Sequence, residues 1–122
     1  MAADILIVDD DKLVRELIST VLTKAGYEAR QADNGEIALL SIAEKVPDLM
    51  ILDIVMPDKE GLETLRDIRS LYPELKVLAI SGGGIGDAGN YLMMADKFGA
   101  TATMQKPLSL DVLRSTIENL LA

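Results

Sequence analysis

Short apolar runs alternate with longer amphipathic stretches along the whole chain. Residues 5–8 and 49–52 are apolar without interruption, which is typical of strands covered on both faces in a parallel sheet. Further strands are expected at residues 27–32, 76–80 and 101–104. Residues 27–32 are the more polar, so we place that strand at an edge of the sheet.

Between these runs, apolar residues recur at helical spacing. The first stripe ends at Gly26 and consists of Val14, Leu17, Ile18, Val21, Leu22 and Ala25. A second helix is expected to begin at Asn34 and to end before Pro47, and a third spans residues 59–71. The next helix covers residues 88–98, with inward positions at Leu92, Met93 and Ala95. In the last helix, Ser109 is the expected N-cap, and the inner face is Leu113, Ile117, Leu120 and Leu121.

Five strands alternating with five helices predict an α/β fold with right-handed crossovers. We expect a five-stranded parallel sheet with helices on both faces, a three-layer (βα)5 sandwich. Its expected strand order is the flavodoxin-like 2-1-3-4-5. The 122 residues are expected to form one domain.

Composition excludes several classes of function. The chain has no cysteine and no histidine, which excludes disulfides, thiolate or imidazole metal sites and histidine-based triads. Its net charge of −8 argues against direct nucleic-acid binding, because phosphate contacts need a basic patch. No apolar stretch approaches the roughly 20 residues needed to cross a bilayer, and the first residues do not form a signal peptide. We therefore expect a cytoplasmic protein without membrane contact.

Polar residues follow four of the expected strands at the point where each strand ends. They are Asp9 and Asp10, Asp53, Ser81 and Lys106. In the order 2-1-3-4-5 the first and third strands are neighbours, so the three carboxylates are expected within a few ångströms of one another. Three carboxylates and one ammonium sum to about −2, which a hard divalent cation such as Mg²⁺ or Mn²⁺ would balance.

Magnesium commonly joins carboxylates to phosphate oxygens, so this set of residues predicts a phosphoryl-binding site. Lys106 and Ser81 are expected to meet phosphoryl oxygens as a charge and a hydrogen-bond donor. An aspartate can itself accept a phosphoryl group as an acyl phosphate. Asp53 stands alone on the central strand, and we assign it as the nucleophile.

Taken together, these residues resemble the receiver domain of two-component response regulators, a CheY-like superfamily, over the whole chain. The motifs are Asp9-Asp10 after residues 5–8, Asp53 with Met56-Pro57 and Gly61, Ser81-Gly82, and Lys106-Pro107. The four motifs occur in the family's order and spacing, and their combination is specific although each alone is weak. The resemblance implies one receiver domain over residues 1–122, apparently a single-domain protein; the end of the sequence does not decide between a full-length protein and an excised domain.

The resemblance also implies roles for particular residues. Asp53 would accept a phosphoryl group from a phosphohistidine, acting as a signalling switch or a phosphorelay intermediate. Asp10, Asp53 and the backbone carbonyl of Val55 would bind Mg²⁺, with Asp9 assisting through water. Ser81 would be the switch hydroxyl.

Lys106 would pair with the phosphoryl group, and its bond to Pro107 would be cis, as in the family. The partners implied are a sensor histidine kinase or phosphotransfer protein and a downstream partner protein, with the domain itself a monomer or weak dimer. Such a domain is a phosphoacceptor, and it assists only its own phosphorylation and dephosphorylation. The family often has an aromatic residue where Thr103 stands here, so an aromatic switch is not expected.

Two alternatives remain open at this point. Asp9-x-Asp11 after a strand partly resembles the nucleophile motif of haloacid-dehalogenase-type phosphatases, but Leu13 replaces the usual threonine or valine. Residues 84–89 form a literal G-x-G-x-x-G, the dinucleotide fingerprint. The following strand ends in Gln105-Lys106 where a dinucleotide site needs an acid for the ribose, and too few residues remain for the rest of that fold.

Overall fold

The computed structural model describes residues 2–54, 61–81, 93 and 95–122. The strands are β1 (Asp4–Val8), β2 (Glu28–Ala32), β3 (Leu49–Asp53), β4 (Lys76–Ser81) and β5 (Ala102–Gln105). The helices described in full are α1 (Lys12–Lys24), α2 (Gly35–Glu44), α3 (Gly61–Leu71) and α5 (Leu110–Leu121). Residues 95–97 are also helical.

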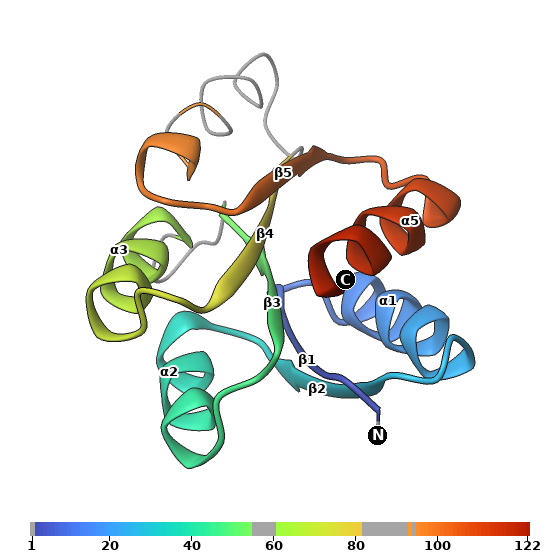
Figure 1. The fold of residues 1–122 in the computed structure, drawn as a ribbon, viewed down its shortest axis with the longest axis horizontal. Helices are drawn as coiled ribbons and strands as arrows, with labels where there is room; N and C mark the ends of the chain where they lie inside the picture. The colour runs from blue at the N-terminus through green and yellow to red at the C-terminus, as the bar shows by residue number, and fades with distance from the viewer. Residues whose placement is uncertain (1, 55–60, 82–92, 94) are drawn as a thin grey trace.

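The strands form one parallel sheet in the order β2-β1-β3-β4-β5, which confirms the predicted topology. Helices α1 and α5 cover one face of this sheet, and α2 and α3 cover the other (Figure 1). The polar strand β2 lies at an edge, as expected from its composition. The fold is therefore the three-layer sandwich that the alternation of elements predicts.

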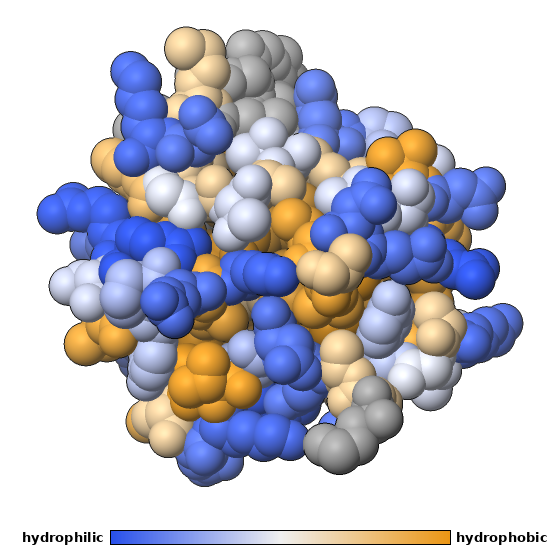
Figure 2. Space-filling model, in the orientation of Figure 1, coloured by the Kyte–Doolittle hydropathy of each residue, from blue (hydrophilic) through white to orange (hydrophobic). Residues whose placement is uncertain are grey.

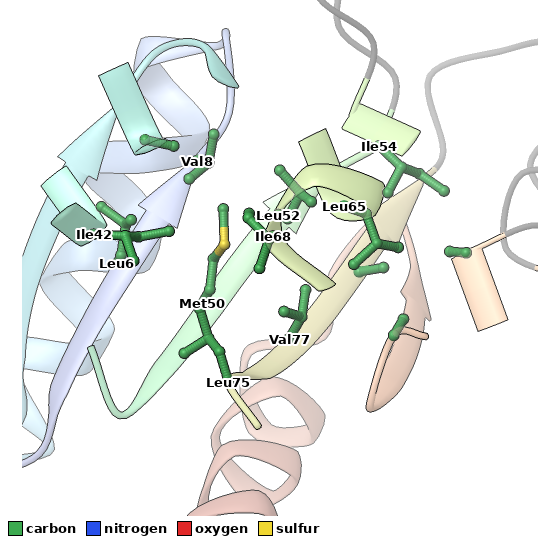
Figure 3. Close-up of a cluster of buried hydrophobic side chains, with 14 of the residues drawn as sticks. Leu6, Val8, Ile42, Met50, Leu52, Ile54, Leu65, Ile68, Leu75 and Val77 are labelled. Carbon is green, nitrogen blue, oxygen red and sulfur yellow. The ribbon is translucent and has the colours of Figure 1, made fainter. Parts of the chain in front are cut away.

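Alternate residues of the central strands belong to two separate cores. Leu6, Val8, Met50, Leu52 and Val77 pack with α2 and α3 (Figure 3). The residues between them pack with α1 and α5 on the other face: Ile5, Ile7, Leu49, Ile51 and Leu78. Because successive side chains of a strand point to opposite faces, covering both faces requires an uninterrupted apolar run.

Helix ends agree with the caps expected from the sequence. Asn34 begins α2 by accepting a hydrogen bond from the Ile37 N–H at 2.9 Å. Ser109 does the same for the Val112 N–H at the start of α5, at 3.4 Å. Gly26 follows α1 with a φ of +93°, a conformation that favours glycine at a helix end.

Two residues predicted to face inward are exposed, and for them the prediction is wrong. Leu17 is 51% exposed, because its neighbour Ile18 holds the buried position of that turn of α1. Met93 is 62% exposed, whereas Ala95 is fully buried. Met93 and Ala95 differ by two positions and so lie about 200° apart around the helix axis, which means that they cannot both face the core.

Figure 2 shows a surface on which polar side chains predominate, with smaller hydrophobic areas between them. Within the described residues, no helix has both the length and the apolar character to cross a bilayer.

An ion pair that no sequence motif indicated lies at the amino end of β1, and its acidic member is buried. Asp4 is 4% exposed and accepts two hydrogen bonds from the Arg30 guanidinium, at 3.0 and 2.9 Å. The same guanidinium donates to the Ser41 and Lys45 carbonyls at the end of α2, at 3.0 and 2.7 Å. Arg30 therefore ties two strands to the helix that follows them.

Replacing Arg30 by Met leaves the Asp4 carboxylate buried, with the Lys45 ammonium 3.7 Å away as its nearest remaining ion-pair partner among the described residues. We expect the free energy of unfolding to fall by about 2 kcal/mol, because an uncompensated buried charge is costly and Arg30 itself is partly exposed. Urea denaturation followed by circular dichroism measures the change. In the control Arg114→Met, an exposed pair with Glu118 is lost, and the expected fall is less than about 0.5 kcal/mol. Equal losses in the two variants would contradict this account.

Candidate functional site

The register of the sheet brings the polar strand ends to one edge. Val8 pairs with Leu52 across β1 and β3, so Asp9 and Asp53 occupy matching positions at the carboxyl ends of adjacent strands. On the other side of β3, Ser81 ends β4 and is paired with Gln105 of β5, which precedes Lys106. Ligands of open parallel sheets bind at this edge, and the residues predicted to meet there do so.

The three carboxylates form a compact acidic cluster. Asp9, Asp10 and Asp53 each place one carboxylate oxygen so that all three oxygens lie within 4.8 Å of one another. Asp9 is 2% exposed and Asp53 is 5% exposed, whereas Asp10 is open to solvent. A set of hard oxygen donors at this spacing can hold a divalent cation of the Mg²⁺, Mn²⁺ or Ca²⁺ type.

Lys106 supplies positive charge to this cluster. Its ammonium lies 3.0 Å from an Asp9 carboxylate oxygen and 3.3 Å from one of Asp53. Burial of the ammonium opposes its charge, but the hydrogen bond to Asp9 and the charges of Asp53 and Asp9 outweigh this, so the pKa of Lys106 is raised. The Lys106–Pro107 peptide bond is cis, as the family resemblance implied.

The pKa of Asp10 is also shifted by its surroundings. Desolvation by the surrounding protein, and then the negative charge of Asp9, raise the pKa of Asp10 above its usual value. Both causes disfavour the charged carboxylate, desolvation more than the charge of Asp9, and a bound cation would lower this pKa.

The hydroxyl of Ser81 is the second notable feature of this edge. Ser81 is fully buried, and its Oγ has no hydrogen-bond partner among the described residues. A buried polar atom left without a partner costs about 1–3 kcal/mol. A phosphoryl oxygen arriving at this edge would satisfy the Ser81 hydroxyl, so the residues present fit a magnesium-bound phosphoryl group.

The start of α3 lies in direct contact with the backbone at the end of β3. A Cβ at Gly61, the first residue of α3, would overlap the Asp53 carbonyl oxygen and the Ile54 Cα. Glycine is therefore required at this position because the helix start touches the backbone beside Asp53.

Sequence reasoning missed one residue at this edge, Arg15 of α1. Its Nη1 donates to the backbone carbonyl of Asp9 at 2.7 Å, and its Nε donates to Gln31 Oε1 at 3.2 Å. The signal available was a basic residue six positions after Asp9, near the start of the helix that follows it, but that spacing alone is not specific. Asp11, by contrast, caps α1 through the Leu13 and Val14 N–H groups, as its position suggested.

Several expectations fall outside the described residues. The Val55 carbonyl, predicted as a metal ligand, is one of them, as is the G-x-G-x-x-G at residues 84–89. Thr103, the residue in place of the expected aromatic, is exposed on β5. For the dehalogenase alternative, Asp11 would be the general acid, but its carboxylate is engaged in capping α1.

Comparison with known proteins agrees with this geometry. A model of the response regulator receiver domain matches residues 5–118. The DNA-binding transcriptional regulator NtrC of Azospirillum brasilense is 34% identical over 98% of this chain and 24% of its own length. Response regulator MprA of Mycobacterium bovis is 35% identical over 99% of this chain and 51% of its own length. The chain thus spans about a quarter to a half of these curated relatives.

Solved structures show the same similarity in three dimensions. The receiver domain of NtrX from Brucella abortus superposes with a TM-score of 0.89 at 35% identity, covering 97% of this chain and 98% of that one. The chemotaxis protein CheY4 of Vibrio cholerae gives a TM-score of 0.87 at 28% identity, covering 99% and 100%. With sequence, fold and strand-end residues in agreement, this chain belongs to the receiver domains of two-component response regulators, a family of signalling domains.

Proposed function

We propose that Asp53 is the phosphoacceptor of this receiver domain. A carboxylate oxygen of Asp53 attacks the phosphorus of a phosphohistidine on a sensor histidine kinase or phosphotransfer protein. The new O–P bond replaces the P–N bond, and the imidazole leaves with the electron pair of that bond. The product is an acyl phosphate on Asp53, and the domain acts as a signalling switch or a phosphorelay intermediate.

The observation that carries this proposal is that three carboxylates meet Lys106 and the Ser81 hydroxyl at one edge of the sheet. Among the described residues, that hydroxyl has no hydrogen-bond partner. Phosphoryl transfer asks little covalent chemistry of a protein beyond positioning and charge neutralisation. Lys106 lies 3.3 Å from Asp53, where its ammonium would follow the charge from the carboxylate to the phosphoryl oxygens. Ser81 would donate a hydrogen bond to another of those oxygens.

The residues proposed to hold Mg²⁺, or Mn²⁺ in its place, are Asp10, Asp53 and the backbone carbonyl of Val55, with Asp9 acting through water. When bound, the cation offsets the negative charge of carboxylates and phosphoryl oxygens together. Asp9 suits the indirect role, because both of its carboxylate oxygens already accept hydrogen bonds, from Asp11 N–H at 2.9 Å and from Lys106 at 3.0 Å.

We further infer that residues 1–122 form one receiver domain that works in the cytoplasm. Its output passes to a downstream partner protein, and its charge of −8 disfavours direct contact with nucleic acid. The domain is proposed to be a monomer or weak dimer, which light scattering would check. It assists its own phosphorylation and dephosphorylation but turns over no other substrate.

Incubation with acetyl phosphate and Mg²⁺ tests the phosphoacceptor. Intact mass spectrometry should show one added phosphoryl group on the wild type, and none on Asp53→Asn, because an amide oxygen is a poor nucleophile and forms no acyl phosphate. Removing Mg²⁺ with EDTA should abolish labelling of the wild type.

The matched control is Asp111→Asn, which changes an exposed aspartate in the first turn of α5. This variant should be labelled like the wild type. Labelling that persists in Asp53→Asn would show that another residue accepts the phosphoryl group.

Replacing Ser81 by Ala should slow phosphoryl transfer without lowering the free energy of unfolding. The free energy of unfolding should stay unchanged or rise by up to about 3 kcal/mol, because the lost hydroxyl is buried and has no partner among the described residues. Labelling by acetyl phosphate should slow about tenfold, the equivalent of one hydrogen bond to the phosphoryl group. Intact mass spectra of samples quenched at successive times give the labelling rate.

Thr64→Val is the control for this prediction. Thr64 is fully buried in α3, and its hydroxyl likewise has no partner among the described residues. Its removal should leave the labelling rate unchanged. If Ser81→Ala labels as fast as Thr64→Val, the hydroxyl of Ser81 has no part in phosphoryl transfer.

A further inference from the structure

Every polar atom of Asp9 takes part in a hydrogen bond. Its N–H donates to the Ala32 carbonyl at 3.2 Å, and its carboxylate accepts from the Asp11 N–H and the Lys106 ammonium, at 2.9 and 3.0 Å. The remaining atom, the backbone carbonyl, accepts from Arg15 Nη1 at 2.7 Å. The backbone that leads from β1 into Asp10 is therefore fixed by contacts from β2, α1 and the end of β5.

Arg15 is the one long side chain among these contacts that the proposed phosphoryl chemistry does not use. Its bond to the Asp9 carbonyl is short and charge-assisted. Gln31, beside the end of β2, accepts from the Nε of the same guanidinium at 3.2 Å. The planar guanidinium thus spans a backbone oxygen and a side-chain oxygen, which a lysine ammonium cannot do in the same geometry.

We propose that Arg15 is a positioning residue for the metal site: its guanidinium, anchored by Gln31, fixes the Asp9 backbone and so sets the Asp10 carboxylate opposite Asp53. This inference rests on the proposed function, since it assigns a residue that prepares the Mg²⁺ site of that function. The Asp10 side chain is solvent-exposed, so little packing fixes its orientation. The orientation of its carboxylate therefore depends on the backbone at Asp9, the residue that precedes it.

Two effects of Arg15 on Mg²⁺ binding have opposite signs. Its positive charge next to the acidic cluster repels a cation, so charge alone predicts that removing Arg15 tightens Mg²⁺ binding. Positioning predicts the reverse, because a carboxylate ligand that has lost its support binds the metal less well. The sign of the change therefore decides between the two readings.

Isothermal titration of the intact chain with Mg²⁺ measures the effect without any phosphoryl transfer. In Arg15→Met, the dissociation constant for Mg²⁺ should rise about tenfold, the lower end of the range for residues that orient metal ligands. Arg15→Lys should also bind more weakly, although it keeps the charge. Gln31→Met should shift the dissociation constant in the same direction by a smaller factor, with no change of charge at all.

Arg114→Met is the matched control, because it removes an equal charge from the exposed face of α5 and should leave Mg²⁺ affinity unchanged. Thermal unfolding in EDTA reports whether each variant is folded before metal is added. If Arg15→Met does not fold, Arg15→Lys and Gln31→Met carry the test.

Tighter or unchanged Mg²⁺ binding in the Arg15 variants would overturn the inference. A wild type that binds Mg²⁺ and is labelled at Asp53, together with unaltered Arg15 variants, would refute the role of Arg15 and leave the proposed function standing. A wild type that binds no Mg²⁺ would refute both.

Discussion

The repulsion among three carboxylates at one edge of the sheet is the constraint on which the site depends. Oxygens within 4.8 Å repel by about 3 kcal/mol or more per pair at an effective dielectric constant of about 20. On the same scale, the contacts of Lys106 at 3.0 and 3.3 Å attract by about 5 kcal/mol each. Attraction and repulsion nearly cancel on this scale. A bound divalent cation would add an attraction to all three carboxylates.

Contacts outside the acidic cluster hold its carboxylates close together. Packing of apolar side chains on both faces of β1 and β3 holds the two strands in register, and that register places Asp9 beside Asp53. At the other end of the same strand, Asp4 is paired with Arg30, so β1 carries a neutralised acid at one end and a crowded cluster at the other. The ion pair of Asp4 with Arg30 and the acidic cluster thus lie at opposite ends of β1.

Much of this arrangement could be predicted from the sequence, because the two periodicities of the chain are clear. Continuous apolar runs indicated strands covered on both faces, and alternation with helices indicated a parallel sheet. The order 2-1-3-4-5 is one of two common orders for such sheets, and it was expected because it makes the first and third strands neighbours. Asp9, Asp53 and Ser81 were then candidates for the site, since each stands directly after an apolar run. Lys106 follows a more polar strand, so its place at the site depended on the expected end of that strand.

What could not be predicted depends on contacts between side chains distant in the sequence. Arg15 and Arg30 are ordinary surface residues by composition, and their roles arise from carbonyl oxygens supplied by other elements. Met93 and Leu17 fit an apolar stripe by type, but the exposed fraction of a helical residue depends on how wide a strip its neighbours cover. Hydrophobicity patterns give the direction of a face and leave its width open.

The absence of a side chain at Gly61 has a mechanical consequence. Because the start of α3 rests directly on the backbone of Asp53 and Ile54, there is no flexible side chain between them to absorb a displacement. A displacement of the backbone at Asp53 and Ile54 would therefore displace the start of α3 directly. Any redesign that inserts atoms at this joint would have to move the entire helix away from the strand.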